Sequence, residues 1–191
     1  MNKISYIIFH VYILLALCLF KINAIEIIFK YDLDLFKDLA KLINHNQNDN
    51  ELRIRFVDPI YYLNNKDIPF DYDLTITSNI TFIGNENGTI FDFQNDVRGK
   101  MKFLYNIKNN SNYKNTVKVE NIHFINYGDT EYLLSGVGLL KVSTTVDNFQ
   151  CIFKNCIFEN SRQALIYIRN DYCYKPIPEE SIVLFENCFF K

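Results

Sequence analysis

The chain has 191 residues, enough for one domain, and its hydrophobic content of 49% can support a core, which excludes a globally disordered protein. Its 17 Phe and 13 Tyr, with no Trp, favour strands over helices. The formal net charge is −2, and no cluster of Lys and Arg indicates a nucleic-acid partner.

Residues 1–24 have the pattern of a secretory signal peptide. Lys3 precedes an apolar stretch over residues 4–20, and Ala24 is the small residue at the expected cleavage point. An uncleaved anchor is the alternative, because about 17 apolar residues can just span a bilayer. We favour cleavage, which predicts a secreted, extracellular chain with no membrane span. Removing Lys3 and Lys21 leaves 18 basic and 22 acidic residues, a net charge of −4, and four cysteines.

Residues 25–70 are expected to form an N-terminal, helix-containing cap. A strand is predicted over residues 25–29, followed by a helix over about residues 32–44 with one apolar stripe. Leu52, Ile54 and Phe56 then alternate with arginines, as in a half-buried strand. A stack of repeats needs its first unit shielded, because an open row of backbone donors and acceptors recruits other chains.

Residues 71–191 contain a repeated template, Asn-x-x-Phe. Its four copies span residues 79–82, 121–124, 155–158 and 187–190, with Phe-to-Phe spacings of 42, 34 and 32 residues. Each copy follows a short β-rich run, and self-similarity at such a period indicates a solenoid. Three short strands per repeat, separated by bends, predict a triangular coil.

Stacking these coils predicts two columns of side chains. Parallel strands in successive coils lie about 4.8 Å apart, so equivalent residues lie above one another. We expect an interior aromatic stack made of Phe82, Phe124, Phe158 and Phe190. We expect a ladder of hydrogen-bonded side-chain amides at the preceding bend, made of Asn79, Asn121, Asn155 and Asn187.

On this template and the turn at residues 82–85, the chain resembles the right-handed parallel β-helix proteins of the pectin-lyase-like fold. The resemblance covers residues 71–191 and implies a mainly β solenoid, with an α/β cap before it. The last copy stops at Lys191, so the chain resembles a short or truncated member with an uncapped C-terminal end. We expect self-association through that open coil.

Cys156 and Cys188 occupy the same template position in consecutive coils. Their Cα atoms are expected about 4.8 Å apart, inside the disulfide range of roughly 4.4–6.8 Å. The sequence leaves open a disulfide between the coils or two buried free thiols.

Three N-glycosylation sequons begin at Asn79, Asn87 and Asn109. A place in the amide ladder would occupy the side chain of Asn79. Asn87 and Asn109 lie in turn-like stretches and are therefore the expected glycosylation sites.

The sequence lacks the catalytic motifs of enzymes with this fold. The paired Asp, Gly-His-Gly and Arg-Ile-Lys motifs of polygalacturonase-like members are absent, and Arg98, Arg162 and Arg169 lie in separate turns without the clustered Asp of pectate-lyase-like sites. His45 and His123 alone cannot build a three-His metal site after cleavage. We expect no catalytic residue, cofactor or metal. A weak calcium site at Asp71 and Asp73 is the alternative to a solvated strand.

Tyrosines near strand ends are the remaining functional signal, because aromatic faces stack on sugar rings or on another protein. The alternative is that they pack the core. We expect a secreted, non-catalytic β-helix module, structural or adhesive, whose partner is a polysaccharide or an extracellular protein. The alternative is a fragment or diverged relative of a polysaccharide lyase or glycoside hydrolase.

Overall fold

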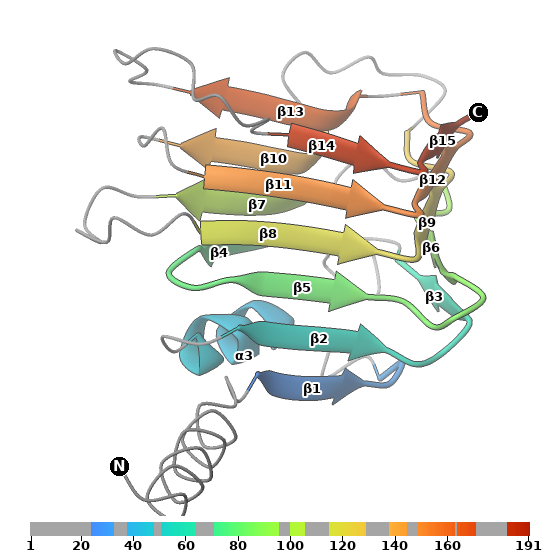
Figure 1. Ribbon diagram of the computed structural model, residues 1–191. Coiled ribbons are helices and arrows are strands. Elements are labelled where there is room, and N and C mark those ends of the chain that lie inside the picture. Colours follow the sequence, from blue (N-terminus) through green and yellow to red (C-terminus); the bar gives the residue numbers. More distant parts are fainter. Residues whose placement is uncertain are drawn as a thin grey trace, which may run out of the picture.

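The computed structural model describes residues 24–32, 38–47, 51–63, 71–95, 100–105, 115–128, 138–144, 149–162, 164–170 and 183–191. Over these residues the structure is mainly β, with three parallel sheets and one short helix (Figure 1). The expected signal segment, apart from Ala24, lies outside these residues. Within the described ranges, no helix has the length and apolar character needed to cross a bilayer.

We call the sheets 1, 2 and 3, and from the second strand onward the chain visits them in that order. Sheet 1 contains β1 (Ile25–Phe29), β2 (Leu52–Phe56), β5 (Ile80–Ile83), β8 (Asn115–Glu120), β11 (Phe149–Lys154) and β14 (Val183–Glu186). Sheet 2 contains β3 (Ile60–Tyr62), β6 (Thr89–Asp92), β9 (Ile122–Ile125), β12 (Ile157–Glu159) and β15 (Phe189–Phe190). Sheet 3 contains β4 (Asp71–Thr75), β7 (Lys100–Tyr105), β10 (Gly138–Thr144) and β13 (Ala164–Asn170). This topology is compatible with the expected parallel β-helix.

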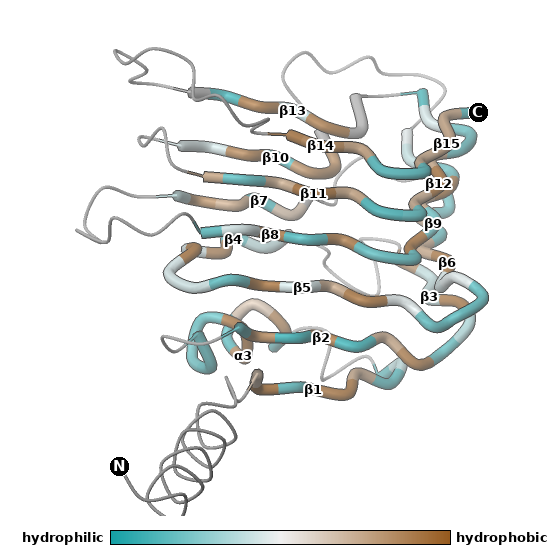
Figure 2. Tube along the Cα trace, in the orientation of Figure 1, coloured by the Kyte–Doolittle hydropathy of each residue, from teal (hydrophilic) through white to brown (hydrophobic). Residues whose placement is uncertain are grey.

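Alternation along the strands separates an interior from three outer faces. In β2, Leu52, Ile54 and Phe56 are buried, whereas Arg53 and Arg55 point outward, as the sequence predicts. Figure 2 shows this alternation of hydrophobic and hydrophilic residues along β2.

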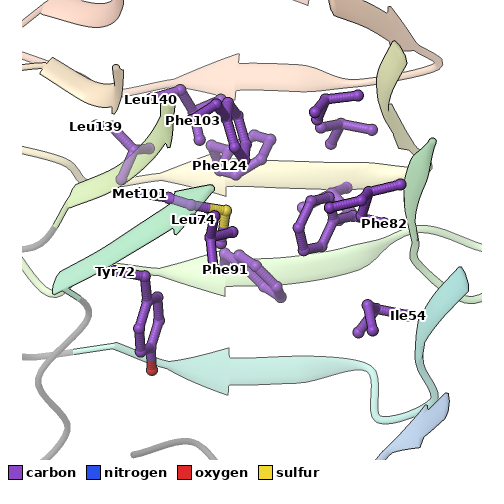
Figure 3. Close-up of a cluster of buried hydrophobic side chains, with 14 of the residues drawn as sticks. Ile54, Tyr72, Leu74, Phe82, Phe91, Met101, Phe103, Phe124, Leu139 and Leu140 are labelled. Carbon is purple, nitrogen blue, oxygen red and sulfur yellow. The ribbon is translucent and has the colours of Figure 1, made fainter. Parts of the chain in front are cut away.

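The core lies between the three sheets and receives side chains from each of them. Figure 3 shows Phe82 of sheet 1, Phe91 of sheet 2 and Phe103 of sheet 3 within one buried cluster. The rings of Phe82 and Phe103 lie 6.0 Å apart, so sheets 1 and 3 are in direct contact through aromatic groups.

The sheets already begin inside the segment expected to be the cap. β1 pairs with β2, and β2 and β3 are in register with β5 and β6. The element that differs from the repeats is α3 (Leu39–Asn46), which inserts the buried Leu39 and Ile43 into the core. It covers the predicted helix from Leu39 onward, and residues 33–37 lie outside the described ranges.

Side-chain amides at the end of α3 close the free edge of β4. Oδ1 of Asn44 accepts from the Thr75 N–H at 3.3 Å. Gln47 donates to the Thr75 carbonyl at 2.7 Å and accepts from the Thr77 N–H at 2.8 Å. β4 is the edge strand of sheet 3, so these amides bind backbone groups that would otherwise be open to another strand.

This arrangement predicts the effect of replacing Gln47. Gln47→Leu keeps the size of the side chain but removes both hydrogen bonds, so we expect the free energy of unfolding to fall by about 1–2 kcal/mol. Urea denaturation followed by circular dichroism measures the change. Lys41→Leu, at a highly exposed position of the same helix, is the control and should change stability by less than about 0.5 kcal/mol. Equal losses in the two variants would contradict the edge-closing role.

Candidate functional site

Three of the four asparagines predicted to form a ladder lie together at the corner between sheets 1 and 2. Asn121, Asn155 and Asn187 follow β8, β11 and β14 and have φ values of 56°, 52° and 52°. Asn tolerates this left-handed conformation better than most residues. Nδ2 of Asn155 donates to Oδ1 of Asn121 at 3.1 Å, and Nδ2 of Asn187 donates to Oδ1 of Asn155 at 3.4 Å. The amides therefore link three successive coils.

Asn79 lies at a different corner, between sheets 3 and 1, and is not part of this ladder. Its Oδ1 accepts from the Thr116 N–H at 2.9 Å. In this coil the corner between sheets 1 and 2 is built by the five residues 84–88 instead of by an asparagine, so the first template copy falls on the preceding side of the triangle. The Asn79 sequon was expected to be unused because the ladder would occupy its side chain. Asn79 lies outside the ladder, so that reason does not apply.

The turn at residues 84–88 packs closely against the next coil. A Cβ atom on Gly84 would lie 2.0 Å from the Asn121 carbonyl oxygen, and Gly88 has a φ of 88° and faces the His123 ring. Asn87, an expected glycosylation site, is exposed in this turn, and its N–H donates to Oδ1 of Asn85. Asn109 lies outside the described residues.

The aromatic column lies in sheet 2 and includes Phe91 in place of Phe82. The rings of Phe124 and Phe158 are stacked at 5.3 Å, and those of Phe158 and Phe190 at 4.9 Å. Phe190 is exposed, so the prediction that it lies in the interior is wrong. Phe91 is in register with Phe124 and meets it edge-on at 5.8 Å. Phe82 is also buried, but it belongs to sheet 1 and is in register with Val119.

A second asparagine corner was missed by the sequence reasoning. Asn126 and Asn160 follow β9 and β12 between sheets 2 and 3, with φ values of 57° and 53°. Nδ2 of Asn126 donates to Oδ1 of Asp92, one coil below, at 2.9 Å. The signal was present, because the copies at residues 121–126 and 155–160 begin and end with Asn.

The cysteines of the upper coils are free thiols. Cys156 donates to the Val119 carbonyl at 3.5 Å, and Cys188 donates to the Phe153 carbonyl at 3.3 Å. Cys151 is also free, and burial raises its pKa to about 11. The structure contains Cys156 and Cys188 in the thiol form, the first buried and the second half-buried.

Within the described part of the chain, no group of three or more His, Cys, Asp and Glu side chains is placed to hold a metal. His123 points outward from β9, and its pKa is lowered, mainly by desolvation and then by Lys191. Asp73 is an exposed outward residue whose carboxylate lies 3.8 Å from the Lys102 ammonium. Arg98 lies outside the described residues, and Arg169 is on β13.

The outer face of sheet 3 brings cationic side chains and one tyrosine together from three neighbouring strands. Its first in-register column consists of Asp73, Lys102, Lys141 and Tyr167. Its second column consists of Thr75, Leu104, Ser143 and Arg169. We call these eight residues the sheet 3 face. Nζ of Lys141 lies 5.3 Å from the centre of the Tyr167 ring, in a cation–π contact.

The outer face of sheet 1 has a different charge pattern. Arg53 pairs with Glu51 at 2.9 Å, Arg55 with Glu26 at 2.8 Å and Lys118 with Glu120 at 2.6 Å. The hydrogen bond from Arg53 also lowers the pKa of Glu51, against the effect of its burial. Charges on sheet 1 are thus neutralised within the face, whereas on the sheet 3 face Lys102 lies 3.8 Å from Asp73 and Lys141 lies over the neutral Tyr167 ring.

The geometry of the sheet 3 face suits a repeating anionic ligand. Its rows follow the spacing between strands, about 4.8 Å, and its strands are fixed by backbone pairing in register. Lys and Arg attract anions, and Tyr offers a flat surface for stacking. The grouping was not predicted, because its members come from four coils.

The chain matches no protein-family model, and no curated protein and no solved structure matches it.

The asparagine corner generates a stability prediction. Asn155→Ala should lower the free energy of unfolding by about 2 kcal/mol, because Ala loses two amide contacts and is strained at positive φ. Asn155→Gly also loses these contacts but adopts positive φ freely, so we expect roughly half that loss. Urea denaturation curves of both variants give the values. A glycine variant less stable than the alanine variant would refute this account of the corner.

Proposed function

We propose that the chain is a secreted, non-catalytic, right-handed parallel β-helix module of the pectin-lyase-like kind that adheres to an extended anionic polysaccharide through the sheet 3 face. Secretion is supported by the signal-peptide pattern of residues 1–24. The coil is supported by the order in which the strands visit the three sheets. Its hand is supported by the rise of the chain in Figure 1 and by the strong preference of parallel crossovers for that hand.

The observation that carries the proposal is the in-register grouping of Lys102, Lys141 and Arg169 with Tyr167 on the outer face of sheet 3. An extended polymer lying across the strands meets a cation or an aromatic ring in each of the upper three coils. The strands hold the backbone of these residues in place before binding, so little backbone ordering opposes association. The attraction is electrostatic at a solvated surface, so it weakens as salt rises.

The choice of face follows from the charge pairs on sheet 1. An anion at Lys118 or Arg55 would compete with Glu120 or Glu26, which already lie within 2.6–2.8 Å of those cations. On sheet 3, the Asp73 to Lys102 contact is longer, at 3.8 Å, and Lys141 faces a neutral ring. An incoming carboxylate or sulfate therefore displaces weaker existing charge contacts at sheet 3 than at sheet 1.

Binding of polygalacturonate tests the proposal. We expect Lys141→Gln to weaken binding about tenfold in low salt, the loss of one charged contact of about 1.4 kcal/mol. Isothermal titration calorimetry measures the affinity, and binding of the wild-type protein should decline as sodium chloride is added. Lys118→Gln is the matched control because it removes the same charge from sheet 1.

Two results would count against the proposal. Equal weakening by Lys118→Gln would mean that net charge, and not the sheet 3 face, governs binding. Equal binding of neutral dextran, with no effect of salt, would exclude an anionic ligand. Release of shortened or unsaturated products during the same incubations would instead support the alternative of a diverged lyase or hydrolase.

A further inference from the structure

Cys156 and Cys188 lie side by side immediately before two neighbouring strands of sheet 2, β12 and β15. Ile157 is in register with Phe189, and the Phe189 N–H donates to the Cys156 carbonyl at 2.9 Å. The cysteines, one residue before each strand, are therefore opposite each other. Neighbouring strands are about 4.8 Å apart, and disulfides join Cα atoms separated by roughly 4.4–6.8 Å.

The two thiols occupy one column just inside the asparagine corner. Lower coils fill the same position with Thr89 and Ile122. The Thr89 hydroxyl donates to the Asp58 carbonyl at 3.2 Å, and both thiols likewise donate to carbonyls of the coil below. The side chains of the column thus point in the same direction, so the two sulfur atoms lie side by side in neighbouring coils. Consistent with this, Cys188 contributes to raising the pKa of Cys156.

We propose that Cys156 and Cys188 are an oxidisable pair that forms a disulfide between the last two described coils when the protein meets a small-molecule disulfide such as oxidised glutathione. The physiological occurrence of the bond rests on the proposed secretion, because oxidising compartments maintain disulfides. The capacity to form it rests on the geometry alone.

The exchange has two steps, and both balance. The Cys188 thiolate attacks one sulfur of oxidised glutathione, which forms a mixed disulfide and releases one glutathione thiolate. The Cys156 thiolate then attacks the sulfur of Cys188, which forms the protein disulfide and releases the second glutathione. The protein loses two hydrogens, and one glutathione disulfide becomes two thiols.

Burial determines the order and the rate of these steps. Cys156 is buried, which raises its pKa to about 12, whereas the side chain of Cys188 is half-buried. Little Cys156 thiolate exists at neutral pH, so the second step is slow in the folded protein and accelerates with pH up to that pKa. It is faster during refolding, before the last coil covers Cys156. Once formed, the bond ties β14 and β15 to β11 and β12.

The test uses the full chain, purified under reducing conditions and refolded in a mixture of reduced and oxidised glutathione. We expect two thiols to disappear in a titration with Ellman's reagent, and peptide mapping to find Cys156 joined to Cys188. The oxidised wild type should unfold at a higher urea concentration than the reduced wild type. Cys151→Ala should behave in the same way, whereas Cys188→Ala should gain no stability on oxidation.

Cys188 is half-buried, so its alanine variant is expected to fold, and Cys188→Ser provides a second version if it does not. Retention of both thiols at equilibrium, or linkage to Cys151 or Cys173 instead, would overturn the proposal. Because this experiment uses purified protein, its failure is distinct from a failure of secretion, which is read separately from the location of the protein in expressing cells.

Discussion

Backbone hydrogen bonding in register between successive coils is the constraint on which the rest of this structure depends. All pairings in the three sheets are parallel, and each assigns a residue to a fixed neighbour in the coils above and below. Side chains alternate between the interior and the solvent with a period of two, so a slip by one residue would reverse every assignment in a strand. The register therefore determines which residues form the core and which form the outer faces.

Equivalent side chains of successive coils lie above one another, and aromatic rings can pack in such a column because they stack at the spacing of the strands. Phe124 and Phe158 stack in the interior with nearly parallel rings, and Phe153 stacks on Phe185 in the same way in sheet 1. The exposed Phe190 continues the first stack in the last described coil. The two stacks meet edge-to-face, as between Phe153 and Phe158 at 6.0 Å. Offset stacking and edge contacts are the favoured arrangements of aromatic pairs. Identical residues in one column thus contact each other without a change in the backbone.

Much of the fold could be predicted from the sequence because alternation is a local signal. Strands such as residues 52–56 and 122–125 are recognised from their own residues. The assignment of Phe82 could not be made in this way, because inward aromatic residues occur in strands of both sheet 1 and sheet 2. The distinguishing feature was the connection that follows: residues 84–88 form a full turn, whereas Asn121 makes the equivalent corner alone. The sheet 3 face depends on pairing across four strands separated by long connections, so no local pattern in the sequence reveals it.

The same register that builds the core also determines the chemistry of the surface. Lys102, Lys141 and Tyr167 form a column for the same reason that Met101, Leu140 and Ile166 line up beneath them: adjacent residues on each strand point to opposite faces of one paired sheet. The spacing of the outward charges is therefore as fixed as the packing of the inward apolar groups. A change in the strand pairing would move the outward charges and the inward apolar groups together. The stability of the coil is therefore coupled to the geometry that it presents to a ligand. In such a fold a binding face needs no loop to position it, because the strand pairing already places every outward residue of the face.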